Sequence, residues 1–399
     1  IEATHDVVLL LADAAATPWT RCCARQGDEV VLLAHADDEP APGAIEQACG
    51  LLGGEALLAP TTVLVLVHPG GRRGPTGSAR WRAGRQLRAI VHLRHGDAAD
   101  VARLARLLGR RGVGLVLSGG GARGAAHVGV YRALLERGVP VDAVGGTSMG
   151  AVFGAVMAFD ATPDDLTDMF ERHFADNPTG DFTLLPLLGL IKGRRLLGMM
   201  ERTERRFGAA AGLDIEDLWK SYFCIATNYS RAAEEVLDRG PLVPAVMATC
   251  SIPGAMPPVL REGELLCDGG VFNNLPVDVM RRTWGIGHVI GVDLGLALPN
   301  RIDLEALPTP WQLLRDRLRS PRRRRYRLPT LPNYLMNVTA LYGTARQRAA
   351  AADADLVLRP ALPRMGMLQW KRYAEAVQVG YDEARRALEA AGDWTRGSL

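Results

Sequence analysis

A serine at the centre of the stretch GGTSMG is the residue of this sequence best suited to nucleophilic chemistry. Gly146, Ser148 and Gly150 fit the pattern G-x-S-x-G, between a strand-like segment and a helix-like segment of small residues. This context is typical of a nucleophile elbow, which holds a serine hydroxyl clear of a sheet. Glycine is expected on both sides because close strand–helix packing leaves no room for side chains. The alternative is a plain packing turn.

A run of glycines precedes this serine, in the stretch SGGGARG at residues 118–124. Gly119, Gly121 and Gly124 have the spacing G-x-G-x-x-G, after a strand-like segment and before a helix-like one. Such a loop can present backbone N–H groups to the pyrophosphate of a dinucleotide. It can equally present them to the oxyanion of a tetrahedral intermediate in acyl transfer.

The position of the nearest acidic residue favours acyl transfer. A dinucleotide site needs a carboxylate at the end of the second strand, about 20 residues after the glycines. Asp142 lies 18 residues after Gly124 (142 − 124), but it precedes the apolar strand instead of following it. Adjacent parallel strands place their C-terminal turns side by side. We therefore expect the glycine amides and the Ser148 hydroxyl to form one acyl-transfer site, with a nucleotide-binding α/β module as the alternative.

A serine nucleophile requires a proton acceptor, which is usually a histidine, but in this sequence Asp268 is better placed than the histidines. His127 follows the glycine run, and His288 opens a strand at the end opposite to the predicted site. Asp268 ends the apolar stretch in LLCDGG, where burial would raise its pKa toward that of a useful base. The alternative is that Asp268 only caps a turn, as residues of D-G pairs commonly do.

The stretches GGGARG, GTSMG and DGG together resemble the patatin-like phospholipase family. The stretch ATCSIPGAMPPV (248–259) is similar to the family's segment before the aspartate. The resemblance implies Ser148 as nucleophile and Asp268 as base, with no catalytic histidine. No carboxylate cluster resembling a calcium site accompanies the motif, so we expect no metal and no cofactor. It further implies an oxyanion hole at Gly119, Gly120, Gly121, Arg123 (through its backbone) and Gly124, with turns supported by Gly146, Gly150, Gly269 and Gly270.

Three further stretches resemble the neuropathy target esterase branch of that family: residues 19–40, VPVDAVGGTSMGA and IEDLWKSYFCIATNYS. The similarity extends from about residue 6 to about residue 385. It implies hydrolysis of acyl ester bonds in phospholipids and lysophospholipids. Cyclic-nucleotide-binding-like domains commonly lie upstream in this branch. The sequence starts at Ile1 and not at methionine, so we expect further sequence before it.

Apolar patterning predicts the elements that position these groups. Alternating strand-like and helix-like segments indicate a mostly parallel sheet and an α/β fold. The resemblance specifies a patatin-like α/β/α sandwich preceded by a smaller α/β domain. We expect an N-terminal Rossmann-like domain at 1–108, a catalytic domain at 113–300 and a C-terminal helical extension at 301–399. Strands are predicted at 7–13, 29–36, 61–69, 87–94, 113–117, 141–147, 221–230, 263–270 and 287–295, and helices at 42–52, 125–138 and 149–160.

Composition limits the partners of the chain. A net charge of +3 on 399 residues argues against general nucleic-acid binding, which needs a concentrated basic face. The six cysteines form no C-x-x-C pair and no disulfide framework, which indicates a reducing compartment and no zinc site. Neither a signal peptide nor an apolar span of about 18 residues is present, so we expect a cytoplasmic protein.

Two segments are candidates for contact with a membrane. The apolar stretch FTLLPLLGLI (182–191) is followed by KGRR (192–195), which suits peripheral binding to the inner membrane face. The alternative for this stretch is a buried core helix broken at Pro186. The run Arg322–Arg325 suits either anionic lipid or, by default, a solvated basic loop.

Overall fold

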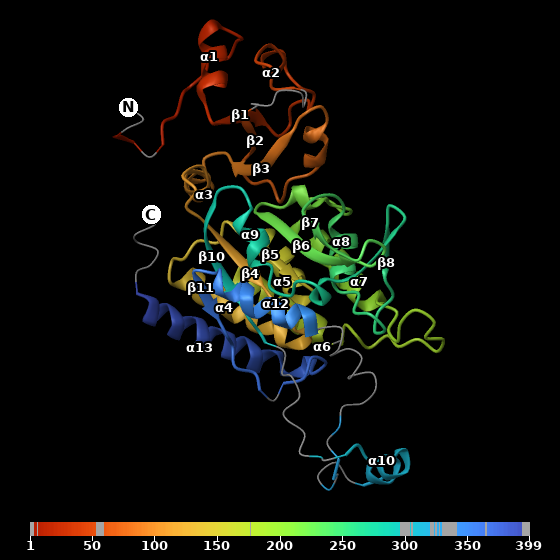
Figure 1. Cartoon of the computed structure of the whole chain (residues 1–399). Helices are drawn as coiled ribbons and strands as arrows, with labels where there is room; N and C mark the ends of the chain where they lie inside the picture. Colours follow the sequence, from red (N-terminus) through yellow and green to blue (C-terminus); the bar gives the residue numbers. More distant parts are fainter. Residues whose placement is uncertain are drawn as a thin grey trace.

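A computed structural model describes residues 4–5, 7–52, 60–175, 177–295, 304, 306–319, 323, 325–326, 328, 341–363 and 365–392. In this part of the chain the strands form two sheets, one small and N-terminal and one large and central (Figure 1).

The small sheet consists of three parallel strands in the order β1-β2-β3. Their bounds are Glu29–His35, Thr61–His68 and Leu87–Arg94, which confirms three of the predicted strands. Helices α1 (Pro18–Gln26), α2 (Ala44–Ala48) and α3 (Ala98–Leu108) accompany them. The strand predicted at 7–13 is wrong, because residues 7–11 pair with no neighbouring strand and their apolar side chains are exposed.

The central sheet has the strand order β11-β10-β4-β5-β6-β9-β8, and β7 pairs with β6. The strands from β11 to β6 are parallel, whereas β7, β9 and β8 run antiparallel to their neighbours. The bounds are β4 Gly112–Leu117, β5 Ala143–Thr147, β6 Ser221–Asn228, β7 Ala233–Leu237, β8 Val259–Arg261, β9 Glu264–Asp268, β10 Ile286–Val292 and β11 Leu356–Leu358.

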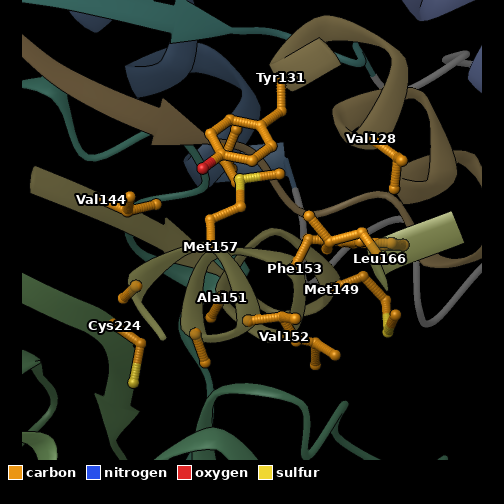
Figure 2. Packing of buried hydrophobic residues seen from close by; sticks show 14 of the residues in the cluster. Val128, Tyr131, Val144, Met149, Ala151, Val152, Phe153, Met157, Leu166 and Cys224 are labelled. Carbon is orange, nitrogen blue, oxygen red and sulfur yellow. The ribbon is translucent and has the colours of Figure 1, made fainter. Parts of the chain in front are cut away.

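Helices cover both faces of the central sheet, as predicted for an α/β/α sandwich. Leu115 and Leu117 of β4 face the larger core, whereas Val116 between them faces the smaller one, since side chains alternate along a strand. Figure 2 shows Phe153 and Met157 of α5 in the larger core, near Leu166 and Tyr131. That core contains residues of α4 (Ala126–Glu136), α5 (Met149–Ala158), α6 (Pro163–Ala175), α7 (Arg194–Phe207), α8 (Leu242–Thr249) and α13 (Tyr373–Ala391), and the smaller core contains residues of α9 (Val277–Arg281) and α12 (Leu341–Ala352).

The C-terminal part of the chain completes the sandwich. β11 extends the parallel sheet beside β10, so the predicted helical extension at 301–399 also contains a strand. α13 packs along α4 so closely that a Cβ atom at Gly380 would lie 2.0 Å from the carbonyl oxygen of Ala126. A Cβ atom at Gly129 would likewise lie 1.9 Å from the carbonyl oxygen of Val377. The two helices therefore cross through paired glycines.

Contacts of β3 connect the small sheet to segments beside the central sheet. His92 of β3 bonds through Nε2 to the carbonyl oxygen of Glu216 at 2.7 Å, and the guanidinium of Arg94 lies 3.9 Å above the Trp219 ring. Arg94 also pairs with Asp160, two residues after the end of α5. None of the helices in the described ranges is long and apolar enough to span a membrane.

Candidate active site

Ser148 lies in a strained turn between β5 and α5. Its backbone has φ +54° and ψ −127°, in a region that residues with a Cβ atom rarely adopt and that costs about 1–3 kcal/mol. Cβ atoms at Gly146 and Gly150 would lie 2.7 and 2.2 Å from the carbonyl oxygen of Leu117. The two glycines therefore allow the strand and the helix to approach closely enough to form this turn.

Asp268 lies at the end of β9 and is buried, with 6% of its surface exposed. Its carboxylate accepts a hydrogen bond from the Gly270 amide at 2.7 Å, and its own amide donates to the Ser251 carbonyl at 2.9 Å. Burial raises the pKa of Asp268 to about 6, although hydrogen bonding from Gly270 and from the Ser148 side chain lowers it in part. The Ser148 side chain is therefore close enough to Asp268 to affect the pKa of its carboxyl group.

Strand order brings these two residues together. β6 lies between β5 and β9, with Thr147 paired to Ile225 and Asp268 paired to Ala226. A Cβ atom at Gly269 would lie 2.1 Å from the carbonyl oxygen of Ile225, so only glycine fits after Asp268. Ser148 and Asp268 consequently flank one end of β6, although 120 residues separate them in the sequence (268 − 148).

The glycine run lies beside Ser148, but its amides are not equivalent. A Cβ atom at Gly119 would lie 3.1 Å from the Ser148 Cβ, and the Gly119 amide donates to Asn274 Oδ1 at 3.2 Å. The Arg123 amide donates to the Gly120 carbonyl at 3.3 Å. Among the described residues, no acceptor contacts the amides of Gly120 and Gly121. The amides of Gly119 and Arg123, by contrast, are already bonded within the protein.

The remaining predicted residues support the turns. Gly124 packs against α5, where a Cβ atom would lie 2.9 Å from the Phe153 ring. Gly270 supplies the amide that bonds Asp268. Asn274 was missed by the sequence analysis, and its side chain also donates to Gln347 at 3.0 Å. Its only signal was its place six residues after Asp268, in the stretch NNLP.

The residues considered for other chemistries lie elsewhere or are already bonded. Asp142, the acidic residue considered for a dinucleotide site, is buried directly before β5. Its carboxylate pairs there with Arg106 at 2.6 Å. His127 is buried and bonds to the Ser118 carbonyl, and burial lowers its pKa to about 4. His288 lies near the start of β10. In the described ranges, no group of three histidine, cysteine or acidic residues could hold a metal ion.

Comparison with known proteins defines the class of this chain. Residues 115–281 match the family model of patatin-like phospholipases, so the chain belongs to that family. Residues 1–104 match the Neuropathy Target Esterase family P-loop like domain, which places the chain in the neuropathy target esterase branch.

Relatives of known name align with nearly the whole chain. Patatin-like phospholipase domain-containing protein 6 of Mus musculus is 31% identical, over 100% of this chain and 31% of the relative. Patatin-like phospholipase domain-containing protein 7 of Rattus norvegicus is also 31% identical, over 100% of this chain and 31% of the relative. Neuropathy target esterase sws of Drosophila melanogaster is 29% identical, over 96% of this chain and 29% of the relative.

The chain spans about a third of the length of these relatives. Among solved structures, VipD from Legionella pneumophila aligns with 70% of this chain and 67% of that chain, at 14% identity and a TM-score of 0.38.

Proposed function

We propose that the chain is a serine esterase that hydrolyses acyl ester bonds of phospholipids or lysophospholipids. Ser148 is the nucleophile and Asp268 is its general base. The observation that carries this proposal is the place of the buried Asp268 carboxylate, which lies at the same end of β6 as the Ser148 turn and has its pKa raised to about 6 by burial. A base of this pKa is ionised at neutral pH and still binds a proton well enough to help remove one from an alcohol.

The reaction proceeds in two steps. Asp268 takes the proton of Ser148 as its oxygen attacks the ester carbonyl, and the protonated carboxyl then gives that proton to the departing alcohol. The amides of Gly120 and Gly121 stabilise the oxyanion, and each such donor contributes about 3 kcal/mol in well-studied enzymes. In the second step Asp268 activates water, which releases the fatty acid and restores the Ser148 hydroxyl.

Lipid as the substrate is supported by the family and by one exposed segment of this chain. The apolar loop, residues 182–190, is no helix, so the alternative of a buried core helix at this place is wrong. Its exposed apolar side chains are Phe182, Leu184, Leu185, Leu187, Leu188 and Leu190, and Leu184 is 99% exposed. Exposure of so many neighbouring apolar side chains to water is energetically unfavourable. A patch of this kind is suited to insertion into a membrane leaflet.

The apolar loop is attached to the segment that leads to the candidate site. Ile191 donates to the carbonyl of Ala255 and Leu190 to that of Gly254, shortly after Ser251, which accepts the Asp268 amide. Lys192, Arg194 and Arg195 follow and are exposed, at a position suited to lipid phosphates. We propose that this surface contacts the inner face of a membrane and delivers lipid to Ser148.

Hydrolysis assays with three variants test the proposal. Ser148→Ala should abolish release of fatty acid from phosphatidylcholine and lysophosphatidylcholine, and Asp268→Asn should lower it by about 10²–10⁴-fold. Ser230→Ala is the matched control, since Ser230 is exposed and its hydroxyl accepts the amide of Leu265, away from Ser148 and Asp268 in the sequence. Near-normal turnover by either site variant would refute the assigned roles. An active chain that hydrolyses simple esters and no lipid would refute the substrate class alone.

A further inference from the structure

Helix α10 (Pro310–Arg317) presents apolar side chains to solvent instead of to the protein. It lies at the end of the molecule opposite to β1–β3, apart from the central sandwich (Figure 1). Trp311 is 77% exposed and Leu318, directly after the helix, is 83% exposed. Leu314 and Leu307 are exposed as well. A helix of eight residues is marginal in water without a partner for its apolar face, so this exposure requires an explanation.

Hydrogen bonds within the segment stabilise α10 despite this exposure. Thr309 accepts the Gln312 amide at 3.3 Å, and Gln312 Oε1 accepts the Thr309 amide at 2.8 Å, which forms a capping box before Pro310. Asp316 is buried and accepts the amides of Arg325 and Tyr326, each at 2.9 Å. The polar groups of the segment are thus hydrogen-bonded within the segment itself, whereas its apolar face is exposed to solvent.

The uncovered face has the pattern of an interfacial helix. Trp311, Leu314 and Leu318 are spaced at i, i+3 and i+7, which places them in one stripe of the helix surface. Exposed Arg315 and Arg319 lie beside this stripe. Arg323 and Arg325, from the predicted basic run, are exposed too, whereas Arg322 and Arg324 lie outside the described residues.

We propose that α10 is an interfacial helix that inserts the stripe of Trp311, Leu314 and Leu318 into an anionic lipid leaflet. Tryptophan favours the boundary between headgroups and acyl chains, and arginine side chains bind lipid phosphates. A lipid surface fits better than a protein groove, because the exposed charged residues that the structure describes around the stripe are arginines and Asp316 is buried. This inference rests on the proposed lipid-directed function and adds a second contact to the apolar loop.

Fluorescence quenching tests the insertion at the helix itself. The full chain is mixed with vesicles of phosphatidylglycerol and brominated phosphatidylcholine, whose bromine atoms quench a tryptophan that enters the acyl region. We expect Trp311 to be quenched, so that Trp311→Phe removes most of the lipid-dependent change in fluorescence. An equal change in both proteins would overturn the proposal, because the apolar loop contains no tryptophan and other residues would then account for it.

Vesicle co-sedimentation gives the binding strength. Leu314→Glu combined with Leu318→Glu should lower binding to phosphatidylglycerol-containing vesicles by roughly tenfold or more. Leu33→Glu is the matched control, since Leu33 is an exposed leucine on edge strand β1, and its binding should stay unchanged. Unchanged binding of the double variant would overturn the proposal. So would size-exclusion data showing that the lipid-free chain is a dimer that the double variant dissociates, because a second copy would then cover the stripe.

Hydrolysis of a simple water-dispersed ester separates this inference from the proposed function. The double variant should keep full activity on that ester and lose hydrolysis of vesicle lipid in proportion to its lost binding. Absence of ester hydrolysis in the parent chain would refute the esterase proposal without affecting the quenching result.

Discussion

The amide of Ser148 donates a hydrogen bond of 2.9 Å to the hydroxyl of Thr249, at the end of α8. The Thr249 hydroxyl in turn donates to the carbonyl oxygen of Ile225 in β6. One side chain therefore ties the strained turn at Ser148 to the strand that separates it from Asp268. Thr249 contacts no reacting atom in the proposed mechanism, and its role is to position Ser148.

Replacement of Thr249 tests this positioning role. Thr249→Val removes the acceptor for the Ser148 amide, and we expect kcat to fall by roughly 10–100-fold with little change in KM, since an unpaired buried group costs about 1–3 kcal/mol. Thr249→Ser keeps the hydroxyl and should restore most of the rate. A structural role alone would lower the melting temperatures of both variants without this difference in kcat.

The raised pKa of Asp268 predicts the pH dependence of the activity. The base must be ionised to accept a proton, so kcat/KM should fall as the pH drops below about 6, following one protonation. The measurement is a pH–rate profile on an uncharged ester, with thermal unfolding recorded at each pH to exclude denaturation. A profile that stays flat down to pH 4.5, about 1.5 units below that pKa, would contradict a role for Asp268 as base.

The same burial predicts that Asp268 destabilises the folded chain. Its pKa is about 6 when folded against an ordinary value of 3.8, so above pH 6 ionisation costs the folded state about 3 kcal/mol. Below the ordinary pKa both states are protonated and the cost disappears. Asp268→Asn should therefore raise the midpoint of denaturant unfolding at pH 8 and leave it nearly unchanged near pH 3.5. An Asn variant less stable than the parent at pH 8 would show that the carboxylate is well solvated.

The crossing of α4 and α13 depends on glycine. Gly380→Ala would place a Cβ atom 2.0 Å from the backbone oxygen of Ala126, which cannot move without shifting α4. We expect a loss of several kcal/mol in stability, as for overpacked cores. Gly198→Ala in α7 is the matched control, because its nearest neighbour is the flexible end of Arg202 at 3.3 Å. That variant should be stabilised by up to about 1 kcal/mol, since alanine favours helix more than glycine does.

Local patterns predicted the strands and turns that carry Ser148 and Asp268. The G-x-S-x-G pattern and the D-G-G turn both reflect backbone approaches that only glycine permits, so their signals are short-range. The resemblance to patatin-like phospholipases was needed to predict that the two turns form one site. Hydrophobic periodicity predicts strands, but it does not reveal which strands are neighbours in a sheet. The antiparallel placement of β9 against β6 in particular had no local signal.

The errors have physical causes as well. The stretch at 7–13 has the composition of a buried strand, but a strand requires a neighbour to bond with, and composition does not supply one. β11 is only three residues long and follows a helix, so its pattern was too short to recognise. Thr249 and Asn274 act through contacts between segments distant in the sequence, which single-residue reasoning does not reveal.

Covalent labelling of Ser148 is the most direct measurement of the proposed nucleophile and base. The chain is treated with a fluorophosphonate, which reacts with activated serines, and the modified peptide is located by mass spectrometry. We expect one adduct at Ser148 in the parent chain, with labelling of Asp268→Asn slowed by at least about tenfold because the base is missing. An adduct at another serine, or equally fast labelling of the Asn variant, would contradict the proposed dyad.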